Sequence, residues 1–200
     1  HAAEVGPCLL HIAQALAAGI SGGEGGDTID NTGDITTASS ATADAGSVTV
    51  NLAGAAPAEA GTTALAAGVG IDGGADDDTI TNSGNLSITS GASTDASSVS
   101  VTLAGYGDCE ADNLASALSS GISGGEGSDT IANTGSITLT AGATAEAGSV
   151  SVGLAGAVLG KAGTTASAAA VGLDGGSGAD VIQNSGAIVA EFLQGLADAL

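Results

Sequence analysis

Hydrophobic and polar residues alternate with a period of two along most of this chain. In residues 137–147, every odd-numbered position is Ile, Leu or Ala, and Thr, Gly and Glu occupy the positions between them. After Gly148 the apolar residues change parity, and Val150, Val152 and Leu154 continue the alternation. Alternation of this kind, bounded by Gly, Asn and Asp, is typical of half-buried strands. The pattern therefore predicts β-structure in which the buried face switches near Gly148.

The alternation belongs to a repeat of 51 residues. The phrase GISGGEGSDTIANTG at 121–135 has close counterparts that begin at Gly19, Gly68 and Val171. A fixed period identifies a repeat architecture. Copies one and three share ISGGEG, whereas copies two and four share an AGTTA phrase upstream, so the organisation is A-B-A-B. The repeat keeps three residue types in register without insertion or deletion: Gly22, Gly73, Gly124 and Gly175; Asp27, Asp78, Asp129 and Asp180; and Asn31, Asn82, Asn133 and Asn184.

Each repeat is predicted to contain about four strands, which in the second copy are residues 62–71, 78–82, 85–96 and 98–104. Repeats of fixed length stack most simply as coils of a β-solenoid, in which each strand pairs with its counterparts about 4.8 Å above and below. We therefore predict an all-β, parallel β-helix-like solenoid of about four 51-residue coils over residues 19–188. Because no half-repeat is evident, one coil per repeat is favoured over two shorter coils. Small inward Ala, Gly and Ser residues suit a flat coil with closely spaced walls.

The two terminal segments, residues 1–18 and 189–200, depart from the repeat. CLLHIAQALAAGI and AEFLQGLADAL place Leu and Ile three or four residues apart, which predicts short amphipathic helices, although the first segment also alternates like a strand. We interpret both segments as caps over the open coils or as connectors to neighbouring subunits. The length slightly favours connectors, because 200 residues fall four short of 4 × 51 and a following subunit would resume the solenoid almost in phase.

The composition argues against several classes of function. The formal net charge is −21 and Lys161 is the only Lys or Arg, so nucleic acid is excluded as a partner on electrostatic grounds. No apolar run is long enough to cross a membrane. Tyr106 and Phe192 are the only aromatic residues, too few for the stacking platforms of sugar-binding sites. Hydrolases on such folds need two carboxylates in different environments, whereas these acids recur equally in every repeat. We interpret the chain as non-enzymatic.

The repeated asparagines and aspartates are the strongest candidates for special roles. Each asparagine precedes Thr or Ser and then Gly, where Asn suits a turn and where stacked amides can form a hydrogen-bonded ladder. Stacked aspartates would place like charges about 5 Å apart, which is destabilising unless they are solvated or neutralised by a cation. Two hypotheses therefore stand, calcium binding or acidic turns that face water, for the ladder Asp27, Asp78, Asp129 and Asp180.

The calcium hypothesis comes from a resemblance to the calcium-binding RTX nonapeptide G-G-x-G-x-D-x-U-x. GGEGGDTID, GGEGSDTIA and GGSGADVIQ match it, whereas GGADDDTIT has Asp76 in place of the later glycine. In that family the nonapeptides follow one another directly, whereas these copies are 51 residues apart and could meet only through coil stacking. Calcium is the one cofactor that the resemblance implies.

The two cysteines, Cys8 and Cys109, lack the CxxC spacing of a zinc site. They fit a disulfide in a secreted protein. One coil per repeat places them about two coils apart, roughly 9.6 Å, which is beyond the usual Cα separation of about 7 Å. A bridge within the chain and a bridge between subunits therefore both remain open. Cys8 with His11 is a poor metal pair.

The GGxGxDTIxNSGxI phrase and its strands rich in Ala, Thr, Ser and Val resemble the repeats of large bacterial extracellular β-solenoid proteins, adhesin-like and autotransporter-passenger-like. The resemblance covers about residues 19–190. It implies secretion, an extracellular or cell-surface location, and a structural or adhesive task. No signal peptide and no outer-membrane barrel are evident in the sequence.

The expected function is that of a non-enzymatic structural subunit of an extracellular fibre or surface filament. Open solenoid ends expose unpaired strands, and identical ends that pair head to tail generate an open filament. The expected partner is the chain itself, without nucleic acid and without membrane insertion. One alternative is a monomeric rigid module of a calcium-binding adhesin. A second is an ice-binding solenoid, although Thr62-Thr63 and Thr164-Thr165 recur only in alternate repeats.

Overall fold

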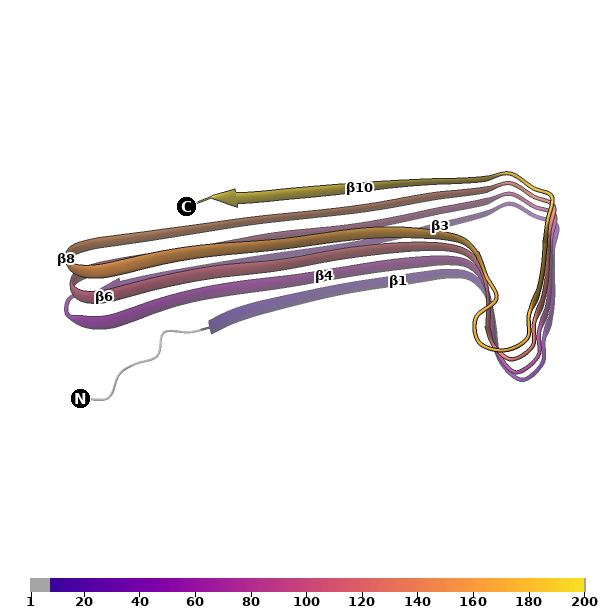
Figure 1. The fold of residues 1–200 in the computed structure, drawn as a ribbon, viewed down its shortest axis with the longest axis horizontal. Coiled ribbons are helices and arrows are strands. Elements are labelled where there is room, and N and C mark those ends of the chain that lie inside the picture. Colours follow the sequence, from indigo (N-terminus) through magenta and orange to yellow (C-terminus); the bar gives the residue numbers. More distant parts are fainter. Residues whose placement is uncertain (1–7, 200) are drawn as a thin grey trace.

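The chain forms a flat, elongated coil that rises by one layer every 51 residues (Figure 1). The computed structural model describes residues 8–199, and within them the side chains of all residues except 8, 9, 56 and 197–199. This described part consists of strands in parallel pairs and contains no helix. The strands are β1 (Cys8–Glu24), β2 (Thr28–Asn31), β3 (Ile35–Asn51), β4 (Gly54–Ala75), β5 (Thr79–Asn82), β6 (Leu86–Glu126), β7 (Thr130–Asn133), β8 (Ile137–Asp174), β9 (Val181–Asn184) and β10 (Ile188–Ala199).

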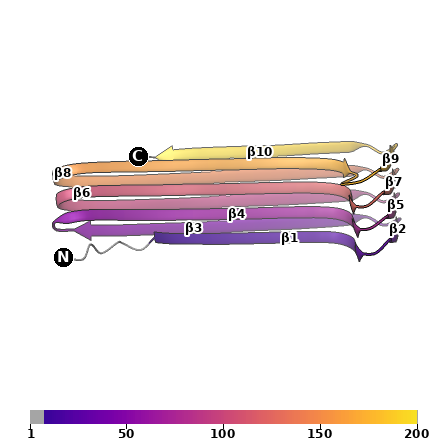
Figure 2. The ribbon, with the colours of Figure 1, turned by 60° about the horizontal axis from the view of Figure 1, so that its bottom comes forward.

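Each coil has two long walls and one short side. Wall A consists of β1, β4 and the second halves of β6 and β8, and wall B consists of β3, the first halves of β6 and β8, and β10. The short strands β2, β5, β7 and β9 form a separate sheet that closes one end of the coil (Figure 2). At the opposite end, which we call the far end, β6 and β8 pass from wall B to wall A without a break. Glycines with positive φ, Gly54, Gly105 and Gly156, make that turn.

The pairing register confirms the predicted all-β solenoid with one coil per repeat. Each paired residue contacts the residue 51 positions further on, as in Ile29↔Ile80 and Ile80↔Ile131. Two shorter coils per repeat would require neighbours at half that separation. The fixed repeat length therefore has a physical cause, because one inserted residue would move every later side chain of its coil to the opposite face.

The interior changes in character from the short side to the far end. Ile and Leu fill it beside the short strands, and buried alanines fill the middle. The walls lie close together, since Ser119 Oγ in wall A donates to the Thr140 carbonyl in wall B at 2.7 Å. Ser90 Oγ in wall B donates in the reverse direction, to the Leu118 carbonyl at 2.6 Å. The predicted small inward residues thus fill the narrow interior space between walls A and B, which we call the corridor. Larger side chains would force the two walls apart.

The predicted switch of the buried face is wrong. Ser149 points inward and is 2% exposed, whereas Val150, Val152 and Leu154 face outward and are 48%, 53% and 81% exposed. A switch of face needs an extra residue in the strand, as in a β-bulge. β6 and β8 instead pair residue by residue through this stretch, from Ser98↔Ser149 to Val101↔Val152. The strands predicted at 85–96 and 98–104 are therefore one continuous strand, in which Leu, Ile and Ala dominate the inward positions up to Ala96 and polar residues occupy them from Ser98 onward.

The predicted terminal helices are also wrong. β1 begins at Cys8 and pairs in register with β4, and β10 pairs in register with β8 as far as Ala199. The apolar residues spaced by three or four lie on both faces of an edge strand. An isolated helix of this length is marginal in water, whereas the neighbouring coil offers each segment a strand to pair with along its length. Residues 1–7 and 200 of the predicted terminal segments lie outside the described residues.

The narrow middle of the corridor gives a test of the packing. Ala143→Leu should lower the free energy of unfolding by about 2–3 kcal/mol, because the larger side chain has no room between walls lined by alanine. The measurement is the midpoint of urea unfolding. Ala38→Leu, at an outward position of the same wall, should stay within about 0.5 kcal/mol of the parent. Equal effects from the two variants would contradict the narrow corridor.

Candidate functional site

The GGxGxD phrase forms the corner between wall A and the short side. A Cβ added to Gly73 would lie 2.4 Å from the Gly124 carbonyl oxygen of the next coil and 2.5 Å from Asp78 Oδ2 of its own coil. Gly124 meets the same crowding from the Gly175 carbonyl and Asp129. These glycines therefore recur because a backbone and a carboxylate both pack against them. This packing contact is sufficient to explain why the glycines recur in the sequence, without a bound ligand.

The repeated aspartates form a hydrogen-bonded ladder. The Asp27 backbone N–H donates to Asp78 Oδ1 at 2.7 Å, Asp78 N–H to Asp129 Oδ1 at 2.8 Å, and Asp129 N–H to Asp180 Oδ1 at 2.9 Å. Asp78 and Asp129 are only 2% and 1% exposed. The hypothesis that these acids face water is therefore wrong for the two central coils. Each buried carboxylate is stabilised by a backbone donor, which is a strong hydrogen bond of the charge-assisted kind.

The second oxygens of this ladder have no partner. The Oδ2 atoms of Asp27, Asp78 and Asp129 are buried and accept no hydrogen bond. Calcium prefers six to eight oxygen ligands, and each coil presents one unused carboxylate oxygen. Residues 8–199 contain no group of three or more His, Cys, Asp or Glu side chains placed to hold a metal ion. Calcium at this ladder remains a prediction that depends on these unpaired oxygens.

The repeated asparagines form a second ladder on the short side. Asn31 Nδ2 donates to Asn82 Oδ1 at 2.6 Å, and the next two steps, to Asn133 and to Asn184, are both 2.7 Å. Each amide nitrogen also donates to the glycine carbonyl two residues later, as from Asn82 to Gly84 at 2.9 Å. Asn82 and Asn133 are fully enclosed. The arrangement is that of stacked amides in cross-β structures.

Both ladders run in one direction. In each, a residue donates to its counterpart 51 positions later in the chain. The ladders therefore end in donors at the coil of Asn184 and in acceptors at the coil of Asn31. The Asn184 amide has two N–H groups, and one of them donates to the Gly186 carbonyl at 3.0 Å. The other corresponds to the N–H group with which Asn31, Asn82 and Asn133 each donate to the next coil.

Cys109 carries a free thiol in this structure. The thiol is fully buried and lies 2.8 Å from the Ser98 hydroxyl. The backbone of Cys8 is in register with Glu59, which is in register with Glu110, so the two cysteines lie two layers apart as the repeat predicts. The structure therefore contains no disulfide at Cys109. A bridge to another subunit would also require the far end of the coil to open around this thiol.

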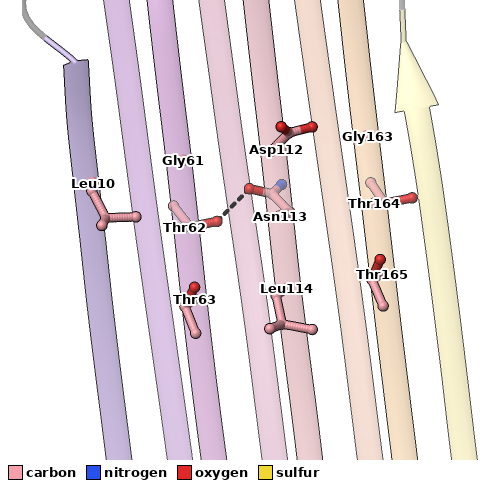
Figure 3. Close-up of a pocket in the computed structure, with 10 residues that line it drawn as sticks. All are labelled: Leu10, Gly61, Thr62, Thr63, Asp112, Asn113, Leu114, Gly163, Thr164 and Thr165. Carbon is pink, nitrogen blue, oxygen red and sulfur yellow. Dashed lines mark hydrogen bonds between the residues drawn. The ribbon is translucent and has the colours of Figure 1, made fainter.

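A shallow groove of about 360 Å³ crosses the outer side of wall A (Figure 3). Gly61 and Gly163 flank Asp112, the only ionisable residue among those that line the groove. Thr62 donates a hydrogen bond to Asn113 inside the wall, as the dashed line in Figure 3 shows. Asp112 is thus the single carboxylate of this groove, beside the outward hydroxyls of Thr63 and Thr165.

The threonine pairs do not form an array on wall A. Thr62 is buried, and Leu114 separates Thr63 from Thr165 in the outward column. Hydroxyl groups do line up on the outer face of wall B, where Thr144 donates to Ser93 at 3.2 Å. This hydroxyl strip was not apparent from the sequence, since its members are Ser in some repeats and Thr in others.

The single lysine is neutralised locally. Lys161 Nζ forms an ion pair with Glu110 of the preceding coil. The hydrogen bond that Lys161 donates to Glu110 and the charge of Glu110, together with the charges of Asp112 and Asp108, raise the pKa of Lys161 above its ordinary value. Both partners are exposed, so the pair contributes little to stability. In the described part, His11 is the only other side chain that can carry a positive charge.

No protein-family model, no curated protein and no solved structure matches the chain. In the described part of the chain, there is no helix of the length and apolar character needed to span a membrane. The structure defines a class, the all-β parallel solenoids. The resemblance to surface adhesins rests on the turn phrase and the composition of the strands, and the resemblance to RTX repeats rests on the turn phrase.

The crowding at the corner gives one test of this site. Gly124→Ala should lower the free energy of unfolding by about 2 kcal/mol or more, because its Cβ would lie 2.5 Å from both the Gly175 carbonyl and Asp129 Oδ2. Gly91→Ala is the matched control, since a Cβ there meets nothing within 4 Å and the change reduces the freedom of the unfolded chain. Urea midpoints that shift equally in the two variants would contradict the role given to Gly124.

The aspartate ladder gives a second test. Asp129→Asn keeps the Oδ1 acceptor for Asp78 N–H and removes a buried charge, so without calcium we expect the melting temperature to rise by a few degrees. The measurement is a thermal melt with chelator and with calcium. If the parent melts higher with calcium and Asp129→Asn loses that shift, the ladder binds the ion. A lower melting temperature for the variant in chelator would show that the carboxylate itself stabilises the fold.

Proposed function

We propose that this chain is a non-enzymatic structural segment that extends head to tail into a rigid fibre. The observation that carries the proposal is the direction of the two ladders. One end of the coil presents acceptors, Asp27 and Asn31, and the other presents donors, Asp180 N–H and the Asn184 amide. A head-to-tail contact joins donors to acceptors, whereas a head-to-head contact would face carboxylate to carboxylate. The ladders therefore favour a heterologous contact, which propagates without closing.

The strand edges support the same contact. In the described residues, β1, β2 and β3 pair on one side only, and so do β9, β10 and the second half of β8. Unpaired edges of this length attract further strands. The interior also matches, because Ala13 and Ala15 at one end correspond to Ala166 and Ala168 at the other, and all four pack on the alanine core. A second copy stacked at the same register would continue the corridor.

The proposed setting is outside the cell, at a surface or in a fibre, with the chain itself as partner. The resemblance of the turn phrase to adhesin-like repeats supports this location. The net charge of −21 opposes binding to nucleic acid and keeps separate fibres soluble. We propose neither a cofactor requirement nor insertion into a membrane for this role.

Two other hypotheses have a specific observation in their favour. The unpaired Oδ2 atoms of the aspartate ladder support a monomeric, calcium-binding adhesin module, which the calcium melt described above tests. The hydroxyl strip on wall B supports the ice-binding hypothesis. Measuring thermal hysteresis of the purified chain tests that function directly. We prefer the fibre because the directional ladders and the open edges support it independently.

The direction of the asparagine ladder gives the test of the fibre. Asn184→Asp keeps the acceptor for Asn133 within the chain and loses the hydrogen bond to the Gly186 carbonyl. It replaces the free donor with a carboxylate that would face Asn31 Oδ1 of the next copy. We expect mean filament length in negative-stain micrographs, and the fast-sedimenting fraction, to fall at least tenfold. Gln183→Glu adds the same charge beside the ladder at an exposed position and should leave assembly nearly unchanged.

Two outcomes would overturn the proposal. One is a parent protein that remains monomeric at millimolar concentration in sedimentation velocity. The other is assembly that Asn184→Asp leaves intact, since this variant removes the donor on which the direction of growth depends. Circular dichroism of each variant checks that the β-structure is retained.

A further inference from the structure

An apolar patch lies on the outer surface of wall B at the far end of the coil. Here the three stacked copies of the SVxVxLAG phrase turn the same side chains outward, and the middle copy is the least exposed. The largest contiguous apolar patch on a soluble protein is often an interaction site. We call this patch the valine face, and its residues are Val48, Val50, Leu52, Val99, Val101, Leu103, Val150, Val152 and Leu154.

The valine face is inverted relative to the rest of the wall. Nearer the short side, the inward positions of wall B hold mainly Ile, Leu and Ala with some Ser and Thr, and the outward positions are mainly polar. At the far end it turns Ser and Thr inward, and three of their hydroxyls, on Ser47, Thr102 and Ser149, are buried without a partner. Apolar strand faces stabilise a fold by being covered. This stretch therefore forgoes that stabilisation within its own coil, and its apolar side remains available to a second surface.

The charges around the valine face select the partner and its orientation. The face itself carries no ionisable group, so two copies can meet there without burying a charge. A row of acids, Asp44, Asp95 and Glu146, lies on the same outer surface four residues before the first valine column, about 13 Å away. If a two-fold axis parallel to the solenoid axis relates the two copies, their facing strands are antiparallel. Only the far ends of the two copies then overlap, and their acidic rows stay apart. A two-fold axis parallel to the strands would instead place the acidic row of one copy against the acidic row of the other, where the like charges repel.

We infer that the valine face pairs with the valine face of a second copy, joining two solenoids side by side through their far ends. The nine side chains cover about 14 Å by 20 Å of sheet, or about 300 Å². A stable interface buries about 800 Å² of accessible surface per partner. A single patch is therefore weak, and pairing strengthens when head-to-tail stacking adds further patches along the axis. The strength of this pairing therefore rests on the proposed fibre. The inference adds a lateral contact that joins two fibres into a pair.

The first experiment removes the apolar character of the central column. Val50→Thr, Val101→Thr and Val152→Thr, made together, keep the β-branched shape that suits a strand. We expect paired filaments to become single in negative-stain micrographs, with their length unchanged. Val69→Thr with Val171→Thr removes outward valines from wall A and should leave pairing as in the parent.

The second experiment detects pairing without filaments. On a Cys8→Ser, Cys109→Ser background, Val101→Cys lies at the centre of the face and should meet its own counterpart across the two-fold. A short bis-maleimide should give at least tenfold more covalent dimer from this variant than from Thr89→Cys, which lies on the same strand beyond the overlap.

The outcomes separate this inference from the proposed fibre. Paired filaments that the threonine variant makes single, with cross-linking at Val101, support the inference. Single parent filaments without cross-linking overturn it and leave the fibre standing. If the parent forms no filaments, the fibre proposal fails and cross-linking alone decides: selective linking at Val101 supports the lateral pair, and equal or no linking at the two positions overturns it.

Discussion

Stacking in register at a fixed interval of 51 residues is the constraint on which the rest of this structure depends. Each side chain lies directly against its own counterpart in the next coil, so any property of one residue is multiplied along the axis. Side chains that stack favourably, such as Asn82 on Asn133, become ladders. Those that stack badly need local compensation. The coil length cannot change without moving every later residue to the wrong face.

The aspartate ladder illustrates such compensation. Four carboxylates in a column repel one another, yet each of the upper three accepts a backbone N–H from the coil below. The glycines opposite, such as Gly73, provide the space that the carboxylate needs. Packing and hydrogen bonding thus account for most of the GGxGxD phrase that resembles an ion-binding motif. Only the unpaired second oxygens leave room for a cation.

The sequence was sufficient to predict the repeat, the solenoid and the number of coils, because these depend on periodicity, which survives in every copy. The predictions from sequence were wrong where the stacking of the coils overrode a local pattern of residues. Val150 and Val152 suggested a buried face, but the corridor there holds small polar residues such as Ser149, and the strand has no bulge that could turn it over. The terminal segments suggested helices by their spacing, but an adjacent coil in the same register offers each of them a partner strand along its whole described length. The direction of the ladders could not be read from residue types at all, since it depends on which neighbour each amide faces.

Continuous strands that pass round the far end have a mechanical consequence. The backbone hydrogen bonds between coils lie roughly along the solenoid axis, across the strands. A load applied to the two ends of the solenoid along this axis therefore opens the coils one after another and does not shear them together. Each coil that peels away frees 51 residues, which extend to about 170 Å of chain. Such a molecule is stiff until its outermost coil yields and then lengthens in equal steps, each much greater than the height of the layer that was lost.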